Sequence, residues 1–246
     1  MTTKKTIILL VEGICELTVF EKAMATLKDD IDVKIIVMDG DPLTNRDNFD
    51  ESVKKIIGNY ISATKKQFHL EDADILFTAQ LTDTDGVFVG EEDIIIDKKF
   101  CDYDNKGYEF DTIRVNSKSK KDDILKRNAQ KLLRINILSK EDKIAGAPYR
   151  LYYFSCNLDH IIYNVSESRR CDKTNKSTEF SKKYADYSSL KNFFNKPDIA
   201  INGDFNTTWD YLRIDENSLK RGSNVHLLFN EIDEYLKTKK NAIKLD

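Results

Sequence analysis

The sequence predicts an α/β fold in which a mainly parallel β-sheet is flanked by helices and followed by a helical C-terminal part. Three observations predict it. The apolar runs at residues 6–11, 32–38 and 73–81 are continuous, as in strands buried on both faces of a sheet. The segments between these runs have apolar residues at helical spacing. After about residue 166, only helix and loop patterns remain.

The first three strands alternate with helices, an order that places functional residues at the carboxyl ends of the strands. The elements expected in this part are, in order, a strand at 6–11, a helix at 16–28, a strand at 32–38, a helix at 48–67 and a strand at 73–81. Those expected later are short strands at 93–96 and 110–115 around an acidic loop at 102–107, a helix at 119–139, a strand at 149–155, and helical segments at 178–195, 207–212 and 225–240.

The helix at 119–139 is expected to pack through an apolar side, while Lys, Arg and Asp residues occupy its other side. Its expected apolar side comprises Ile124, Leu125, Leu132, Leu133 and Ile135. Asn157 follows the strand at 149–155 and is a plausible helix cap. We expect a core at 1–165 with an insertion around 90–145, and a helical part at 166–246 packed on that core.

Composition excludes several classes of protein. With 40% hydrophobic and 33% charged residues the chain is globular rather than disordered. No apolar run reaches the roughly 18 residues that span a bilayer, and the stretch before the first helix does not resemble a secretion signal. The four cysteines form no CxxC pair, so neither a disulfide framework nor a zinc site is expected. We therefore expect a cytoplasmic protein without a membrane partner, and the sequence leaves a homo-oligomer open.

Charge is unevenly distributed along the chain. Residues 1–115 contain 14 Lys and Arg against 24 Asp and Glu, a net charge of −10. Residues 116–246 contain 25 against 18, a net charge of +7. An acidic half beside a basic half suits a metal site next to a surface that binds a polyanion. Ordinary solvated surface charge is the alternative explanation.

Four acidic residues stand at the ends of predicted strands. Glu12 follows the first strand, Glu16 lies one helical turn later, and Asp83 and Asp85 follow the third strand. Residues two apart in an extended segment point to one side, so Asp83 and Asp85 could converge on one cation. Taken alone, Glu12 and Glu16 could merely complement a helix N-terminus, and Asp85 with the next glycine is a common turn pair. Together they suit a hard divalent cation such as Mg²⁺.

The pattern Val-Glu-Gly-x-x-Glu at 11–16, followed two strands later by Asp-x-Asp at 83–85, resembles the Toprim fold. It is similar in particular to the Toprim nucleases of the OLD family and to the small RloB-like proteins linked to bacterial phage defence. The resemblance covers roughly residues 5–90 and the strand at 149–155. The segment 155–159, Ser-Cys-Asn-Leu-Asp, is loosely similar to the segment that follows a late strand in RloB-like proteins.

The resemblance implies phosphodiester cleavage with one or two Mg²⁺ ions, for which Mn²⁺ could substitute. It implies that Glu12 is a general base or a metal ligand, that Asp83 and Asp85 hold the cation, and that Glu16 binds a second metal ion. The sequence departs from the family in two ways. No catalytic lysine is evident, and the ATPase domain of OLD nucleases has no counterpart, which suggests a separate ATPase partner.

Several basic residues are candidates for binding the phosphates of a nucleic acid, which could be DNA or RNA, including tRNA. Lysine and arginine contacts to phosphates supply affinity without sequence information. The candidates are Lys120, Lys121 and Arg127 in the helix at 119–139, and Lys220 and Arg221 at a turn before the last helix. For any one basic pair, a solvated surface is the simpler interpretation.

Two other interpretations remain open. Asp83-Thr84-Asp85-Gly86 is also similar to the nucleophile motif of haloacid-dehalogenase-type phosphatases, in which Asp83 would be phosphorylated and Asp85 would act as acid and base. Asp204 and Asp210 faintly resemble their later metal-binding acids. That motif belongs on a first strand, however, and would leave Glu12 and Glu16 without a role. The other interpretation is a non-catalytic Toprim scaffold that docks to an ATPase.

Overall fold

The computed structural model describes residues 4–38, 40–45, 50–99, 106–108, 111–164 and 170–243. Its strands are β1 (Thr6–Val11), β2 (Asp32–Val37), β3 (Ile75–Asp83), β4 (Ile94–Ile96), β5 (Lys106–Tyr108), β6 (Ile113–Val115), β7 (Lys143–Ile144) and β8 (Ala147–Phe154). Its α-helices are α1 (Ile14–Ala25), α2 (Val53–Phe68), α3 (Lys118–Leu138), α4 (Leu158–Tyr163), α5 (Arg170–Lys183), α6 (Tyr187–Phe194), α7 (Phe205–Leu212) and α8 (Val225–Ile243).

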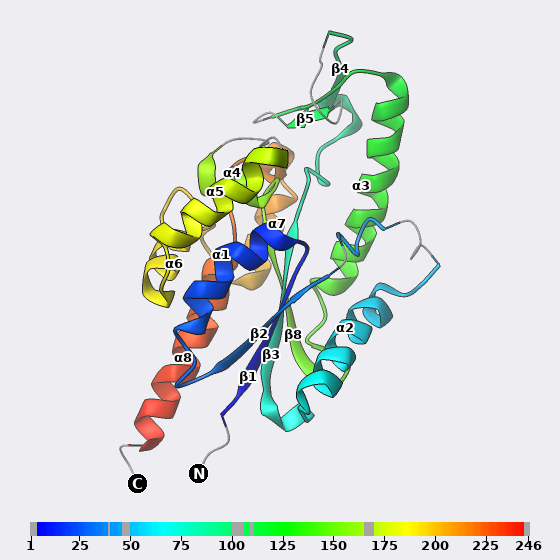
Figure 1. The fold of residues 1–246 in the computed structure, drawn as a ribbon. Helices are drawn as coiled ribbons and strands as arrows, with labels where there is room; N and C mark the ends of the chain where they lie inside the picture. Colours follow the sequence, from blue (N-terminus) through cyan, green and yellow to red (C-terminus); the bar gives the residue numbers. More distant parts are fainter. Residues whose placement is uncertain are drawn as a thin grey trace.

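The main sheet has five strands in the order β2-β1-β3-β8-β7. β1 pairs in parallel with both β2 and β3, and β3 pairs in parallel with β8. Only the short β7 is antiparallel to its neighbour β8. Helices cover both faces of this mostly parallel sheet (Figure 1), which confirms the predicted α/β class.

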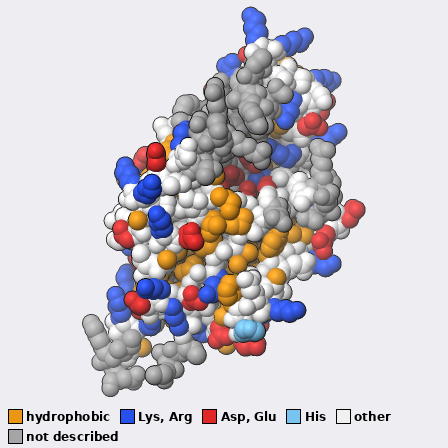
Figure 2. All heavy atoms as spheres, in the orientation of Figure 1, with side chains coloured by type: hydrophobic (Ala, Val, Ile, Leu, Met, Phe, Trp, Pro, Cys, Tyr) orange, Lys and Arg blue, Asp and Glu red, His pale blue; other side chains and the backbone are white. Residues whose placement is uncertain are grey.

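β1 shows why the continuous apolar run of the sequence forms a central strand. Its alternate residues point to opposite faces of the sheet, so Leu9 joins the core under α1, α6 and α8, and Leu10 joins the core under α2 and α3. All six residues of β1 are buried. Burial of each large apolar side chain stabilises the fold by roughly 1.5–3 kcal/mol. The edge strand β2 is only half-buried, and Figure 2 shows apolar side chains gathered on this part of the surface.

A second, smaller sheet lies beyond the carboxyl end of β3. It has three strands in the order β4-β6-β5 and packs against the N-terminal half of α3. Its core includes Ile94, Tyr108 and Ile113 with Ile124 from α3. β5 overlaps the expected acidic loop at 102–107, of which the described part begins at residue 106. The sequence of β5, Lys-Gly-Tyr, lacks the β-branched residues that predicted β4 and β6.

Several predicted elements differ from those in the structure. The buried side of α3 consists of Ile124, Asn128, Lys131, Arg134, Ile135 and Leu138. Leu133 was placed on this side by the sequence, but it points away and is 63% exposed. The stripe that faces the sheet recurs every three or four residues from Ile124, and position 133 does not belong to it.

Two expected helices have different ends. The segment 178–195 was expected to be continuous, but α5 ends at residue 183 and α6 starts at residue 187, where Asp186 accepts a hydrogen bond from the backbone N–H of Ser189. The helix expected at 48–67 begins at Val53, and its predicted first residues 48 and 49 lie outside the described residues, as does the expected boundary at 165–166. Within the described chain, every helix is too short or too polar to span a bilayer.

Candidate functional site

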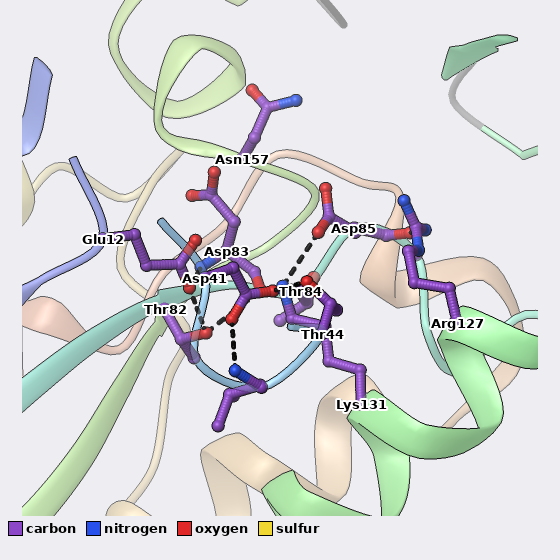
Figure 3. A network of polar contacts seen from close by, with 12 residues as sticks. Glu12, Asp41, Thr44, Thr82, Asp83, Thr84, Asp85, Arg127, Lys131 and Asn157 are labelled. Carbon is purple, nitrogen blue, oxygen red and sulfur yellow. Dashed lines mark hydrogen bonds and ion pairs between the residues drawn. The ribbon is translucent and has the colours of Figure 1, made fainter. Parts of the chain in front are cut away.

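Three acidic residues meet at the carboxyl ends of neighbouring strands (Figure 3). Glu12 directly follows β1, Asp83 is the last residue of β3, and Asp41 lies in the turn after β2. Because β1 lies between β2 and β3 and pairs in parallel with both, their carboxyl ends reach the same edge of the sheet. Figure 2 shows acidic side chains in a recess above the apolar band near β2. This edge is where α/β folds place their sites.

Glu12 is half-buried, and one of its oxygens is fixed by β3. Its Oε1 accepts a hydrogen bond from Thr82 Oγ1 at 2.6 Å and one from the backbone N–H of Asp83 at 3.2 Å. Burial and the negative charge of Asp41 raise the pKa of Glu12 well above its usual range, although Lys131 and Thr82 oppose the shift. Within the described chain, no donor contacts the other oxygen, Oε2.

Asp83 joins the end of β3 to the start of α4. Its Oδ1 accepts a hydrogen bond from the backbone N–H of Leu158 at 2.9 Å, and Asn157 caps the same helix by accepting from the backbone N–H of His160 at 2.9 Å. The predicted cap at Asn157 is therefore confirmed. Burial and the charges of Glu12 and Glu16 raise the pKa of Asp83 well above its usual range. No donor among the described residues contacts Asp83 Oδ2.

Asp85 does not extend the strand as the sequence predicted. Its φ of 52° is left-handed, and Gly86 follows with a φ of 66°. At Gly86, a Cβ atom would also lie 2.6 Å from Leu219, so this position requires glycine. The Asp85 carboxylate is bound by residues of α3 and β5. Its Oδ2 accepts from Lys131 at 2.8 Å and its Oδ1 from the hydroxyl of Tyr108 at 3.2 Å.

Lys131 is the cation at the centre of this site, and it is not among the basic residues that the sequence singled out for phosphate binding. Its ammonium group lies 2.8 Å from Asp41 Oδ2 and 2.8 Å from Asp85 Oδ2, and its side chain has no exposed area. Burial favours the neutral amine, but Asp41 and Asp85 outweigh it and raise the pKa of Lys131 well above its usual range. Lys131 lies seven residues after the buried Ile124, so helical spacing could have placed it on the buried side of α3.

Asp41 was also missed, because Asp-Gly-Asp-Pro reads first as a turn. Its Oδ1 accepts from the backbone N–H of Leu43 at 2.8 Å, and its Oδ2 accepts from Thr44 Oγ1 at 2.9 Å as well as from Lys131. The signal available in the sequence was its position after the second strand, the parallel neighbour of the first.

Glu16 is buried on the first turn of α1 and lies close enough to Asp83 to raise the pKa of that carboxyl group. A Cβ atom at Gly13 would lie 3.3 Å from Glu16 Oε2. Gly13 itself is extended, with a φ of −153°. A side chain at this position would therefore crowd the carboxylate of Glu16, while the backbone there needs no glycine.

The five predicted phosphate-binding residues fall into two groups. Arg127 and Arg221 bind within the protein. Arg127 donates to the Asp85 carbonyl at 3.1 Å and to Tyr108 Oη at 3.2 Å, and Arg221 donates to carbonyls at the end of α4.

The three lysines lie nearer the surface. Lys121 is half-buried and donates to the carbonyl of Glu91 at 2.8 Å. Lys120 is half-buried, and Lys220 is exposed and donates to Asn217 Oδ1 at 3.1 Å. Arg170, next to Arg169 outside the described residues, belongs to α5.

The acids that the phosphatase interpretation requires do not contact Asp83 in the described chain. Asp204 caps α7 by accepting from the backbone N–H of Thr207 at 2.8 Å. Asp210 is an exposed residue of that helix and pairs with Arg213 at 3.0 Å.

The donors fit a hard cation in chemistry, since Glu12 and Asp83 each keep one carboxylate oxygen without a protein donor. Mg²⁺ commonly takes one or two carboxylates and completes its shell with water and substrate phosphates. In the conformation of the structure, no group of three or more His, Cys, Asp or Glu side chains in the described ranges is arranged to hold a metal ion. This edge of the sheet therefore provides two carboxylate ligands, Glu12 and Asp83, and a bound ion would take its other ligands from water and substrate.

Comparisons of the chain with protein-family models, with curated proteins and with solved structures found no match.

Proposed function

We propose that this protein is a metal-dependent nuclease that hydrolyses phosphodiester bonds on a Toprim-like α/β core, with Mg²⁺ or Mn²⁺ bound at Glu12 and Asp83. The observation that carries the proposal is the pair of carboxylates at adjacent strand ends, both with pKa values raised by burial and by neighbouring acids. Burial and the neighbouring acids make the ionised form of both carboxyl groups unfavourable. A divalent cation would offset this effect.

In this reaction a water molecule attacks the phosphorus atom, the bond from phosphorus to the leaving oxygen breaks, and that oxygen takes up a proton from solvent. Glu12 accepts the proton of the attacking water, the role that the resemblance implies for it. Thr82 and the Asp83 backbone N–H keep Glu12 oriented through Oε1. A bound cation supplies positive charge to the phosphate oxygens.

The resemblance to OLD and RloB-like proteins supports a cytoplasmic role as the effector of an anti-phage system, acting on DNA or RNA with a separate ATPase partner. Lys120, Lys121 and Lys220 are the predicted phosphate contacts that lie at or near the surface. The buried Lys131 is the lysine that the sequence did not reveal. Because its side chain is fully covered, it acts through Asp41 and Asp85 and does not touch the substrate.

The test is cleavage of plasmid DNA and of total tRNA by the full chain with Mg²⁺, with Mn²⁺ and with EDTA. Loss of a positioned general base typically costs about 10²–10⁴-fold in rate, so we expect Glu12→Gln to lower cleavage by a factor in that range. Asp83→Asn should also abolish the response to metal. Glu21→Gln and Asp29→Asn, at exposed positions of α1 and the turn after it, are the matched controls.

Two results would replace the proposal. Metal-dependent hydrolysis of a generic phosphomonoester that needs Asp83 but not Glu12 would establish the phosphatase. Inactivity on every substrate, together with tight co-purification of an ATPase, would establish the non-catalytic scaffold.

A further inference from the structure

The acidic residues of the site differ in how completely the protein itself binds their oxygens. All four carboxylate oxygens of Asp41 and Asp85 accept hydrogen bonds, from Leu43, Thr44, Tyr108 and twice from Lys131. Glu12 and Asp83 each use a single oxygen, bound by Thr82 and backbone N–H groups. The site is therefore divided into a pair of acids with bound oxygens and a pair with open oxygens.

Lys131 binds both acids of the first pair, Asp41 and Asp85. Its ammonium group bridges Asp41 and Asp85 at 2.8 Å on each side and is completely buried. Figure 3 shows Lys131 reaching from α3 toward Asp85, on the side of the network opposite Glu12 and Asp83. An ammonium held between two carboxylates occupies the position that a bridging cation would need, and a cation there would have to displace a buried positive charge.

The second pair has no such partner among the described residues. Burial and the negative charges of Glu12 and Glu16 raise the pKa of Asp83, and burial and Asp41 raise that of Glu12. Lys131 lowers the pKa of both Glu12 and Asp83, but it is outweighed there by burial and by the neighbouring acids. A bound cation would therefore be most favourable beside Glu12 and Asp83.

We propose that the Lys131 ammonium takes the place of a second divalent cation, so that this site binds a single metal ion, at Glu12 and Asp83. The inference rests on the proposed function and narrows it from two possible metal ions to one. Asp41 and Asp85 then bind Lys131 rather than a metal ion. The negative charge of Glu16 attracts the same metal ion that Asp83 binds. Lys131 is a positioning residue, because it fixes the two acids beside the metal ligands.

The experiment counts Mn²⁺ ions bound per chain, by electron paramagnetic resonance of free Mn²⁺ during titration of the EDTA-treated full chain. We expect the unmodified chain to bind a single Mn²⁺, and Asp83→Asn to bind none. In Lys131→Met, which has a similar length and no charge, Asp41 and Asp85 lose their cation. This variant is expected to bind a second Mn²⁺.

Asp41→Asn keeps the ion pair between Lys131 and Asp85, so it tests the inference even if Lys131→Met does not fold. It should still bind a single Mn²⁺, and loss of that ion would overturn the inference. Two Mn²⁺ ions on the unmodified chain, or one on folded Lys131→Met, would also overturn it while leaving a metal-dependent nuclease in place. No bound Mn²⁺ on the folded, unmodified chain, together with no cleavage, would overturn the proposed function as well.

Discussion

At Glu12, burial and the charge of Asp41 favour the protonated carboxyl group, and Asp83 is affected in the same direction by burial and by Glu12. A carboxyl group whose pKa is higher in the folded than in the unfolded chain contributes stability below its unfolded pKa, and this contribution is lost as the pH rises through the folded pKa. The contribution of these two groups to the stability of the metal-free protein should therefore fall as the pH rises from about 4.

Glu12→Gln tests this linkage. Glutamine keeps an oxygen for Thr82 and the Asp83 backbone N–H but cannot ionise. We expect urea unfolding of the EDTA-treated variant to depend less on pH between about 5 and about 8 than that of the unmodified chain. At the upper end the variant should be the more stable, by on the order of 1 kcal/mol. If the free energy of unfolding depends on pH in the same way in Glu12→Gln and in the control Glu21→Gln, ionisation of Glu12 does not lower the stability of the protein.

Asp83 has two separable roles, because its Oδ1 caps α4 while its Oδ2 is open to a ligand. Asp83→Asn retains an acceptor for the Leu158 backbone N–H and removes the charge, whereas Asp83→Ala removes both. Loss of a cap costs about 0.5–2 kcal/mol, so the alanine variant should be less stable than the asparagine variant by that amount. Both should lose Mn²⁺ binding. Equal stabilities in urea unfolding would contradict the capping role.

At the scale of elements, the sequence predicts what depends on long, regular patterns. β1 was located to the residue because its apolar run is buried on both faces. The two-residue β7 is too short to have a pattern, and β5, Lys-Gly-Tyr, lacks the β-branched residues that mark the equally short β4 and β6. The left-handed turn at Asp85 depends on contacts of the folded chain, since the Asp85 backbone N–H donates to the Cys156 carbonyl at 2.7 Å.

The candidate site was predictable where it lies on strand ends and unpredictable where it depends on packing. Glu12 and Asp83 follow from the alternation of strands and helices. Helical spacing from Ile124 could have placed Lys131 on the buried side of α3. Its ion pairs with Asp41 and Asp85 depend on the folded chain and could not be predicted from that spacing.

Arg221 connects the turn before α8 to the end of α4, and we expect it to stabilise the fold. Its guanidinium donates to the His160 carbonyl at 3.2 Å, to the Ile161 carbonyl at 3.0 and 2.6 Å, and to Asp198 at 2.5 Å. Hydrogen bonds from charged groups contribute about 1.5–3 kcal/mol each.

Arg221→Ala should therefore lower the free energy of unfolding by at least about 2 kcal/mol. Arg221→Lys should recover only part of this, because a lysine lacks the planar fork of donors. The neighbouring exposed Lys220→Ala should change stability by less than about 0.5 kcal/mol. Urea unfolding of the three variants is the measurement. An unchanged Arg221→Ala midpoint would show that these contacts contribute little and would return Arg221 to the candidate phosphate contacts.

At the scale of the whole molecule, Asp85, just after the end of β3, links the main sheet to the small sheet and to α3. Tyr108 from β5 and Arg127 from α3 contact the side chain and the carbonyl of Asp85. Lys131, from the same helix, holds the Asp85 carboxylate from the main-sheet side. The insertion after β3 therefore helps to build the site that the first three strands begin.

The division of charge between the two halves of the chain gives a prediction about nucleic-acid affinity. If Lys120 and Lys220 contact phosphates, replacing both with alanine should weaken binding to any sequence. The slope of log K against log[salt] should become shallower by about 0.9 for each lost contact on duplex DNA and by about 0.7 on single strands. Fluorescence anisotropy with labelled DNA and RNA at several salt concentrations, in EDTA to prevent cleavage, measures both.

Lys66→Ala with Lys237→Ala is the matched control, because both lysines are exposed and Lys66 lies in the last turn of α2, toward the amino ends of the strands. It removes the same net charge from a part of the surface remote from Glu12 and Asp83. If Lys120 and Lys220 contact phosphates, only their replacement should change the slope of log K against log[salt], and replacement of Lys66 and Lys237 should not. An equal change in both pairs would mean that the polyanion responds to net charge rather than to a surface beside the site.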